Sequence, residues 1–519
     1  MTSSAERVGA GLAPARDPRT IEPGERIHVV GGAGAGASAA AILASRAGAS
    51  VSACDPGAPS SYTPALEALD IPIARQHAAS HVTGPPAPDR LAVTKALTAI
   101  DPDQPELEAA RSLGIPLEPW QQVVADAALG RTLVGVAGTH GKSTTAGWLV
   151  HVLVRAGLDP SAFVGALLPS SLTGGPPATA RWGRGAAFVV EADEYAGNFD
   201  PYRPNLAILT SAEWDHPDVF PDAAAVERAF EAWIRRMPPE STLIANVADP
   251  GIEALLARLA DWPGEIVGYA RLDQAPQRVG GYARAMAERF ATIGGQASAL
   301  LGRVSAADPE STTLEIHGLD PLAGPMIARL PTAGRHNASN ALAVAAAAAA
   351  LGVPPQAIVA GLATFSGVGR RLERKGEVGG VTVYDDYGHH PTAIRETLAA
   401  VRQREPGRPV WAVLEPLTYH RTAAMLGELA DALSGADAVA IADIWAGRDP
   451  DTTIASPAAL AAAVAARRPD VPVAATGSVE ATADWLAGEV APGDVVLVMG
   501  GGRSYRIGEL LLRRLEERG

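Results

Sequence analysis

Short apolar runs that end in glycine or in acidic residues recur along the chain, and such runs predict strands buried in parallel sheets. The first run covers residues 27–30 and leads into a glycine-rich loop, which is followed by small residues typical of a helix up to about residue 47. A second strand is expected at 50–53, and Asp55 follows it. This order predicts a βαβ unit at the start of the fold.

The same pattern starts again twice. Residues 131–136 predict a strand, a second glycine-containing loop follows, and an apolar helix is expected over 146–156. A third series begins near residue 379, with strands expected at 381–384, 410–414, 438–442 and 495–499. We therefore predict an α/β protein of three tandem domains: a Rossmann-like N-terminal domain at 26–129, a central sheet domain at 130–365 and a Rossmann-like C-terminal domain at 366–519. The polar residues 1–25 are expected to form a disordered tail.

The composition agrees with this organisation and excludes some partners. A chain of 519 residues is too long for one hydrophobic core, and 47% hydrophobic residues with 54 glycines and 42 prolines are typical of a globular, loop-rich protein. The net charge of −14 argues against a nucleic-acid binder, because phosphate backbones are bound by an excess of Lys and Arg. Small anionic substrates stay possible, since helix N-termini, metal ions and a few basic groups can hold a phosphate.

The cysteine count and the apolar segments bear on the compartment. Cys54 is the only cysteine, which excludes an intrachain disulfide and favours a reducing cytoplasm. The first 25 residues lack the apolar core of a signal peptide. The most apolar stretch, 341–351, is about half as long as a membrane span and is interpreted as a buried helix. We therefore expect a cytoplasmic protein without a membrane partner.

The first glycine loop contains Gly31, Gly34 and Gly36, and its pattern resembles a dinucleotide fingerprint. Glycines let the backbone approach a pyrophosphate, and the N-terminus of the following helix supplies N–H donors. The loop alone leaves two interpretations open, a phosphate site or a glycine turn without a ligand. One hypothesis is therefore an oxidoreductase that binds NAD here, although it gives no role to the second loop.

The second loop carries the strongest chemical signal. In nucleotide-binding loops of this type the backbone N–H groups cradle phosphates, a lysine reaches the terminal phosphates and a serine hydroxyl binds Mg²⁺. The loop consists of Gly138, Thr139, His140, Gly141, Lys142, Ser143 and Thr144. The strict pattern needs glycine at position 136, where this chain has Val136, so we interpret the loop as a variant P-loop. The central sheet is accordingly expected to be of the P-loop ATPase type.

Two acidic clusters follow expected strands downstream of the P-loop. Residues 191–194 come after the strand at 187–190, and residues 213–216 come after the strand at 206–210. The carboxyl ends of parallel strands form the ligand crevice of such sheets. Carboxylates are ligands that Mg²⁺ prefers, and an imidazole can complete a second site. Each cluster alone could be a solvated strand end, but beside a P-loop the two clusters favour a metal site.

Motifs spread over nearly the whole length resemble those of the Mur ligase family. They are His28-Val29-Val30-Gly31 with its glycine loop, Pro105-Glu106-Leu107 with Ala109-Ala110-Arg111, Leu113-Gly114-Ile115-Pro116, the P-loop, Glu191-Ala192-Asp193-Glu194, Asp215-His216, Gly334-Arg335-His336-Asn337-Ala338-Ser339-Asn340-Ala341, Gly369-Arg370-Arg371 and Tyr384-Asp385-Asp386-Tyr387-Gly388-His389-His390-Pro391. The common order and spacing of these motifs identify the chain as a member of the family.

The resemblance implies a ligase that uses ATP as co-substrate, with Mg²⁺, and works as a monomer or homodimer. It implies that L-alanine is joined to UDP-N-acetylmuramate through an acyl phosphate in peptidoglycan synthesis, with release of ADP and phosphate. The N-terminal domain would hold the UDP-sugar, with Gly31, Gly34, Gly36 and Asp55 as candidate contacts. The central domain would bind ATP, and the C-terminal domain would bring the amino acid and close over the nucleotide.

The resemblance also implies roles for single residues near the phosphates and the base. Lys142 would clamp the β- and γ-phosphates, Ser143 and Glu191 would hold the nucleotide Mg²⁺, and His216 would bind a second ion. Four residues are expected to contact the nucleotide further from the P-loop: Asn337, Asn340, Arg371 and Asp386. The two asparagines are three apart, so they share a helix face, although helix capping is their alternative role.

The implied amino-acid site departs from the family pattern. His389 would lie near the incoming amine with Tyr387 close by, and Arg421 suits the carboxylate of the amino acid. Leu417 and Thr418 stand where the pattern has histidine and arginine, which leaves the amino-acid specificity open. Two alternatives therefore remain beside L-alanine ligation: a murein peptide ligase that attaches a tripeptide to the same sugar nucleotide, and a relative that binds the UDP-sugar without catalysis.

Overall fold

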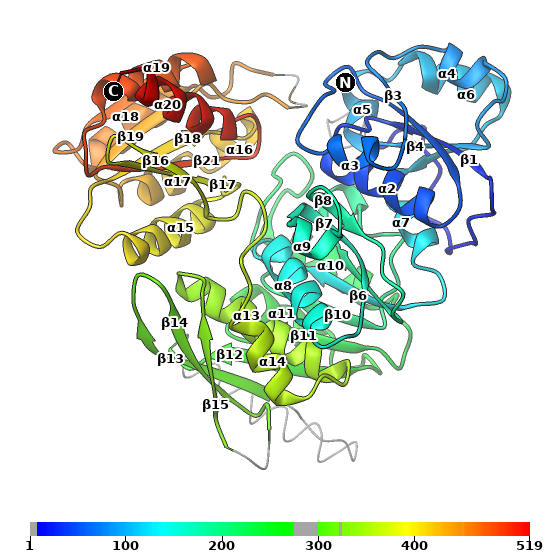
Figure 1. Cartoon of the computed structure of the whole chain (residues 1–519), viewed down its shortest axis with the longest axis horizontal. Coiled ribbons are helices and arrows are strands. Elements are labelled where there is room, and N and C mark those ends of the chain that lie inside the picture. Colours follow the sequence, from blue (N-terminus) through cyan, green and yellow to red (C-terminus); the bar gives the residue numbers. More distant parts are fainter. Residues whose placement is uncertain (1–7, 274–298, 321–323, 448, 450, 519) are drawn as a thin grey trace.

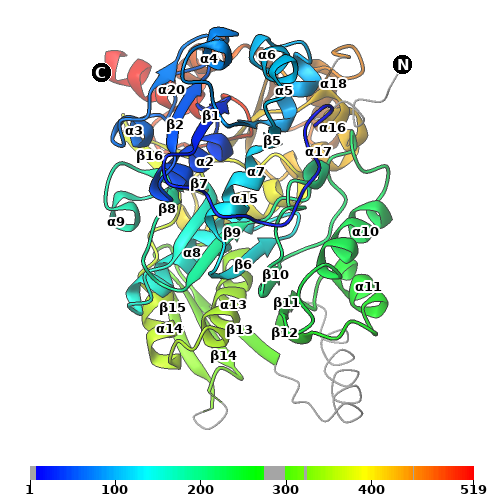
Figure 2. The ribbon, with the colours of Figure 1, turned by 90° about the vertical axis from the view of Figure 1, so that its right-hand side faces the viewer.

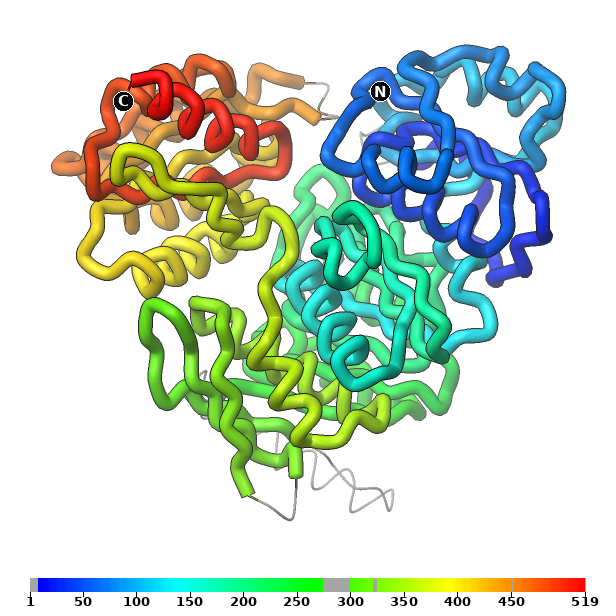
Figure 3. The backbone as a smooth tube through the Cα atoms, viewed as in Figure 1, coloured from blue at the N-terminus to red at the C-terminus, as the bar shows by residue number. Residues whose placement is uncertain are grey.

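The computed structural model describes residues 8–273, 299–320, 324–447, 449 and 451–518, and it contains three sheets built from consecutive parts of the chain (Figure 1). Figure 3 shows the chain passing from the N-terminal unit in blue, through the central unit in cyan and green, to the C-terminal unit in yellow and red. This confirms the predicted α/β class with three tandem units. Among the described residues, no helix has the length and apolar character needed to cross a bilayer.

The N-terminal unit is a five-stranded parallel sheet in the order β3-β2-β1-β4-β5. Its strands are β1 (Arg26–Val30), β2 (Ser50–Cys54), β3 (Ile73–Ala74), β4 (Arg90–Val93) and β5 (Leu117–Pro119). Its helices are α2 (Ala35–Arg46), α3 (Pro64–Glu67), α4 (Ser80–Thr83), α5 (Lys95–Ile100), α6 (Pro105–Leu113) and α7 (Trp120–Ala127). The order reverses between β1 and β4, and a reversal of this kind creates the ligand crevice of Rossmann-like sheets.

The central unit is a ten-stranded sheet in the order β15-β14-β13-β12-β11-β10-β6-β9-β7-β8. Its strands are β6 (Thr132–Ala137), β7 (Ser161–Leu168), β8 (Ala178–Arg181), β9 (Ala187–Glu191), β10 (Leu206–Leu209), β11 (Thr242–Asn246), β12 (Glu265–Arg271), β13 (Ala299–Ala307), β14 (Thr312–His317) and β15 (Met326–Leu330). Its helices are α8 (Lys142–Arg155), α9 (Ser170–Thr173), η1 (Tyr195–Gly197), α10 (Ala223–Ile234), α11 (Pro250–Arg258), α13 (Arg335–Ala350) and α14 (Pro355–Leu362). Because β6 lies between β9 and β10 and is parallel to both, the P-loop and both acidic clusters lie at the carboxyl ends of three adjacent strands.

The C-terminal unit is a six-stranded sheet in the order β16-β17-β21-β18-β19-β20, with only β16 antiparallel to its neighbour. Its strands are β16 (Glu373–Val378), β17 (Val381–Asp386), β18 (Val410–Glu415), β19 (Ala438–Ala442), β20 (Val473–Gly477) and β21 (Val495–Gly500). Its helices are α15 (Pro391–Arg404), α16 (Tyr419–Ala424), α17 (Leu426–Leu433), α18 (Pro457–Arg467), α19 (Val479–Glu489) and α20 (Tyr505–Arg518). The four strands predicted here from continuous apolar runs are confirmed as β17, β18, β19 and β21.

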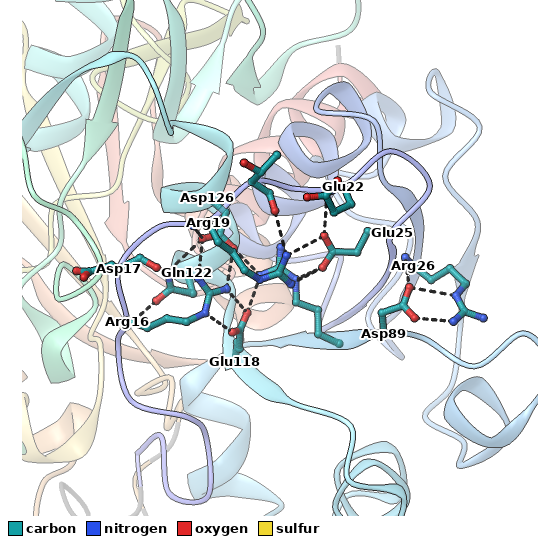
Figure 4. Close-up of polar contacts among 12 residues, drawn as sticks. Arg16, Asp17, Arg19, Glu22, Glu25, Arg26, Asp89, Glu118, Gln122 and Asp126 are labelled. Carbon is teal, nitrogen blue, oxygen red and sulfur yellow. Dashed lines mark hydrogen bonds and ion pairs between the residues drawn. The ribbon is translucent and has the colours of Figure 1, made fainter.

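Residues 8–25 are ordered against the N-terminal sheet, so the prediction of a disordered tail over 1–25 is wrong for this part, while 1–7 lie outside the described residues. Figure 2 shows the segment in dark blue running past α7, and Figure 4 shows how it is held. Arg16 donates hydrogen bonds to Glu118 at 2.8 Å and to Asp126 at 2.8 Å, and both carboxylates also bind the buried guanidinium of Arg90. Ile21 is buried as well. The polar composition of this segment did not indicate order, because the acidic residues that it binds lie far along the chain and are buried.

Candidate active site

The P-loop connects β6 to α8 and has the geometry of a phosphate cradle. Gly138 and Gly141 have φ values of 125° and 81°, a region that favours glycine. A Cβ added to Gly138 would lie 2.3 Å from Oγ1 of Thr210, so the backbone approaches the segment after β10 too closely for another side chain. The helix α8 begins at Lys142, four residues earlier than predicted, which places its free N–H groups directly after the loop.

Lys142 is held among main-chain carbonyls and carboxylates. Its Nζ donates to the Gly138 carbonyl at 2.7 Å and to Oε2 of Glu194 at 3.0 Å, and lies 3.5 Å from Oδ1 of Asp193. Burial raises the pKa of Glu194 to about 7, even though Lys142 acts in the opposite direction. A fixed ammonium group at the mouth of the P-loop can bind the terminal phosphates of a nucleotide.

Two groups of ligand atoms beside Lys142 fit Mg²⁺. Oγ of Ser143 donates to Oε1 of Glu191 at 3.0 Å, so a hydroxyl and a carboxylate already meet at one point. Asp193, Glu194 and His216 form the second group, with one ligand atom from each within 4.8 Å of the others. His216 has a φ of 55°, a left-handed backbone conformation that residues other than glycine seldom adopt. Carboxylate and hydroxyl oxygens are the ligands that this hard cation prefers.

A cavity of about 230 Å³ between the central and C-terminal units contains the residues expected to contact the nucleotide. Asn337 and Asn340 lie on α13, and Nδ2 of Asn340 donates to Oδ1 of Asn337 at 3.2 Å. Asp386 enters from the other side, where its carboxylate accepts N–H bonds from Leu372 at 2.8 Å and Gly388 at 2.7 Å. The other lining residues that were candidates are His140, Gly141, Thr144 and Arg371. The structure thus brings these candidates together.

A second cavity, of about 440 Å³, joins all three units and is the larger cavity of the two. The N-terminal unit contributes Gly36, whose added Cβ would lie 2.1 Å from the ring of Trp120. The candidates from the other units that line it are Thr139, His140, Gly141, Lys142, Ser143, Glu191, His216, Arg371, Tyr387, His389 and Arg421. Phosphate-binding, metal-binding and amino-acid-binding candidates therefore open into one space.

Two arginines of the C-terminal unit contact the central unit, one at the P-loop and the other at the acidic cluster that follows β10. Nη2 of Arg371 donates to Oγ of Ser143 at 2.8 Å. Nε of Arg421 donates to Oδ1 of Asp215 at 2.7 Å, and its Nη2 lies 3.2 Å from Nδ1 of His216. Although burial acts in the opposite direction, Arg421 holds the pKa of Asp215 well below its ordinary value. These contacts bring Arg421, the candidate for binding the amino-acid carboxylate, against the group formed by Asp193, Glu194 and His216.

His389 lies beside this arginine. Nδ1 of His389 is 2.9 Å from the Tyr387 carbonyl, which fixes the proton on Nδ1 and leaves Nε2 as an acceptor. Burial and the charge of Arg421 lower the pKa of His389 well below its ordinary value, so the ring is neutral.

The first glycine loop belongs to the N-terminal unit. Asp55 accepts the Ala33 N–H at 2.9 Å, Gly31 has a φ of 88°, and Gly34 caps α2. Of the four UDP-sugar candidates, only Gly36 lines the cavity among the described residues.

Sequence reasoning did not select several residues of the site. Asp193, Glu194 and Asp215 belong to quoted motifs, and their position after strands was a usable signal. Trp120 and Trp445 also line the larger cavity, and neither follows a motif that could have indicated this. Thr418 has a φ of 61° and caps the N-terminus of α16, the helix that carries Arg421.

Comparisons with known proteins match all three units of the chain. Three family descriptions match in order: "Mur ligase family, catalytic domain" at 26–132, "Mur ligase middle domain" at 136–348 and "Mur ligase, glutamate ligase domain" at 370–502. A UDP-N-acetylmuramate–L-alanine ligase of Frankia casuarinae is 37% identical over 82% of this chain and 84% of the relative.

Two solved structures have a similar fold. A murein peptide ligase from Psychrobacter arcticus has a TM-score of 0.69 and 25% identity, covering 95% of this chain and 99% of the other. A UDP-N-acetylmuramate–alanine ligase from Thermotoga maritima has a TM-score of 0.72 and 22% identity, covering 95% and 100%. With three family domains in order, a P-loop and acidic clusters on one sheet edge, and a docked C-terminal unit, the chain belongs to the Mur ligase family.

Proposed function

We propose that the chain is an ATP-dependent ligase that joins L-alanine to UDP-N-acetylmuramate in peptidoglycan synthesis and releases ADP and phosphate. The observation that carries the proposal is the larger cavity, in which Lys142, the acidic clusters and Arg421 converge from separate units. The relative that is 37% identical and bears this name supports the choice of substrates. The ranges 26–129, 130–365 and 366–519 are the corresponding sugar-nucleotide, ATP and amino-acid domains.

The reaction has two steps. The sugar carboxylate attacks the γ-phosphorus of ATP, the bond to the β,γ-bridging oxygen breaks, and ADP leaves, which gives an acyl phosphate. The amine of L-alanine then attacks the acyl carbon, phosphate leaves, and the amine loses a proton. Phosphoryl transfer depends mainly on positioning and on neutralising charge. Docking of the C-terminal unit excludes water, which would otherwise hydrolyse the acyl phosphate.

The residues of the chain divide these tasks. Lys142 and the N–H groups of the P-loop hold the phosphates, and Asn337 and Asn340 hold the base. Ser143 and Glu191 in one group, and His216 in the other, would hold Mg²⁺, which supplies neutralisation of phosphate charge when bound. Arg421 binds the carboxylate of the amino acid, since a guanidinium forms two parallel hydrogen bonds with a carboxylate.

On the C-terminal side, His389 and Tyr387 lie beside the incoming amine, and Arg371 and Asp386 contact the nucleotide. In the N-terminal unit, Gly31, Gly34, Gly36 and Asp55 hold the sugar nucleotide. The assembly as monomer or homodimer and the cytoplasmic location stay predictions.

A second candidate is a murein peptide ligase that attaches a tripeptide to the same sugar nucleotide. The similarity to the Psychrobacter arcticus structure favours it, and so does the departure at Leu417 and Thr418 in the amino-acid site. Both residues line the larger cavity, where a tripeptide would have to fit. The two candidates share ATP and the sugar nucleotide and differ only in the amine.

The experiment measures ADP formation with UDP-N-acetylmuramate and each of four amines: L-alanine, glycine, L-serine and the tripeptide. We expect the fastest turnover with L-alanine, and a preference for the tripeptide would select the second candidate. Absence of ADP with all four would refute ligase activity.

A variant pair then tests the role of the P-loop. Lys142→Ala is expected to abolish ADP formation and to leave UDP-sugar binding nearly unchanged. The matched control is Lys375→Ala, because Lys375 pairs with Glu373 on β16 and lines neither of the two cavities that contain P-loop residues. Equal loss of ADP formation and sugar binding in Lys142→Ala would contradict the assigned role.

A further inference from the structure

A compact group of sulfur, nitrogen and oxygen ligands lies in the N-terminal unit, outside the two cavities described above. It consists of His28 on β1, Cys54 at the end of β2, His81 on α4 and Glu106 on α6. One ligand atom from each of the four lies within 4.8 Å of the others. The four side chains come from four separate elements, so the fold itself creates the group.

Three of the four side chains are buried and the His81 side chain is 18% exposed, and one buried ring nitrogen lacks a hydrogen-bond partner among the described residues. The exposed fraction is 0% for Cys54, 0% for Glu106 and 2% for His28. Nδ1 of His28 bonds Oγ of Ser52 at 2.8 Å, whereas its Nε2 is buried and makes no hydrogen bond in the part of the chain that the structure describes. A buried polar atom without a partner is costly. The Ser52 contact also resembles the support that metal-bound imidazoles receive through their second nitrogen.

The other three side chains already converge on one point. Sγ–H of Cys54 donates to Oε1 of Glu106 at 3.2 Å, and Nδ1 of His81 lies 2.9 Å from the same oxygen. The Ala78 N–H donates to this oxygen at 2.8 Å, and the Gln104 amide donates to Oε2, so the Glu106 carboxylate is fixed in orientation. Nδ1 of His77 lies 3.4 Å from Sγ of Cys54, just outside the group.

From this geometry we propose that His28, Cys54, His81 and Glu106 bind one Zn²⁺ ion as a closed structural site. One thiolate, one carboxylate and two neutral imidazoles balance the charge of the ion, and this mixture of donors suits zinc. Zinc bonds of about 2.0–2.3 Å place tetrahedral donors about 3.3–3.8 Å apart, so donors within 4.8 Å need only a small contraction. Binding releases the Cys54 thiol proton to solvent, and the Zn–S bond replaces the hydrogen bond to Glu106.

The site would stabilise the part of the fold that carries the first glycine loop. The Cys54 carbonyl accepts N–H bonds from Gly31 at 2.9 Å and from Gly32 at 3.1 Å. A metal bound to the Cys54 side chain would therefore fix the end of β2 and the loop together. It would also tie the short helix α4 and the helix α6 to the sheet.

The presence of a single cysteine makes the test specific. The full chain, purified without a histidine tag and with excess Mg²⁺ to occupy the active site, is analysed for bound zinc and titrated with Co²⁺. We expect about one zinc per chain with a Kd below about 1 µM. We also expect a thiolate-to-cobalt charge-transfer band, which only Cys54 can produce.

Variants locate the ion. Cys54→Ser is expected to remove the charge-transfer band and to weaken zinc binding about 100-fold or more. His317→Gln, on β14 of the central sheet, is the matched control and should keep both signals. Wild-type protein that retains less than a tenth of an equivalent of zinc and shows no charge-transfer band would overturn the proposal. So would zinc binding that survives Cys54→Ser but is lost in His216→Asn, because the ion would then sit in the active site. No readout uses ligase activity, so failure here is distinct from failure of the proposed function.

Discussion

Arg16 provides a quantitative test of the ordered N-terminal segment. Its guanidinium makes four hydrogen bonds to two carboxylates, at 2.8 and 3.1 Å to Glu118 and at 2.9 and 2.8 Å to Asp126. The Arg16 side chain is 30% exposed, whereas the side chains of Glu118 and Asp126 are 8% and 0% exposed. Arg16→Ala leaves both carboxylates buried with Arg90 as their remaining strong partner.

The magnitude follows from two limits. Removing one partner of a fully buried ion pair costs about 3–5 kcal/mol, whereas an exposed pair contributes about 0.2–1 kcal/mol. Because Arg16 is partly solvated and Arg90 still neutralises the acids, we expect a loss of about 2 kcal/mol for opening of the segment. This corresponds to a roughly 30-fold larger opening constant.

Native-state hydrogen exchange measures this opening directly. The Arg19 amide donates to Oδ1 of Asp126 at 3.0 Å, so it should exchange roughly 30-fold faster in Arg16→Ala. Arg26→Ala is the control, since the Arg26–Asp89 pair is exposed and its loss should change exchange of this segment little. Equal effects of the two variants, or unchanged exchange in Arg16→Ala, would refute the reasoning.

The pH dependence supplies a second check. Burial raises the pKa of Asp126, but hydrogen bonds from Arg16, Arg19 and Arg90 outweigh it and hold the pKa below its ordinary value. A carboxyl group that is more acidic in the folded protein contributes stability above its unfolded pKa, and this stability is lost as the pH falls through the folded pKa. The difference between wild type and Arg16→Ala should therefore be complete at neutral pH and shrink below about pH 4.

Three further predictions concern the site. Arg421→Lys should raise the KM for L-alanine roughly 10- to 100-fold in steady-state kinetics, because lysine loses the forked contact and the pairing with Asp215; an unchanged KM would contradict the assignment. Gly36→Ala should weaken UDP-sugar binding in calorimetry, because the new Cβ lies 2.1 Å from the Trp120 ring and the ring must move into the cavity. Arg371→Ala should raise the KM for ATP while leaving UDP-sugar binding unchanged, and equal loss of both would place Arg371 outside the nucleotide site.

Much of the fold could be predicted because buried parallel strands consist of continuous apolar runs in the sequence. The strands β6, β9 and β18 follow this pattern, and glycine loops or acids mark their carboxyl ends. The antiparallel strands β14 and β15 were not predicted, because their half-exposed residues alternate and the runs are broken. The start of α8 was placed too late because the P-loop residues themselves form its first turn.

Contacts between distant residues could not be predicted in the same way. Arg371 and Ser143 lie 228 positions apart, and only the docking of two units brings them to 2.8 Å. The four ligands of the N-terminal group are at positions 28, 54, 81 and 106, a spacing that matches no short metal-binding motif. For the same reason Arg16 looked like part of a solvated tail, since Asp126 is 110 positions away.

The contact between Arg371 and Ser143 also has a thermodynamic consequence. The Ser143 hydroxyl donates its only proton to Glu191 and accepts a hydrogen bond from Arg371, so one lone pair remains. A cation that binds the remaining lone pair lies close to the positively charged guanidinium of Arg371, and the two charges repel each other. Docking of the C-terminal unit and occupation of the P-loop are therefore linked equilibria. A ligand that displaces Arg371 weakens docking, and docking weakens the binding of that ligand by the same factor. Ser143 therefore affects both the binding constant of the P-loop ligand and the docking constant of the C-terminal unit.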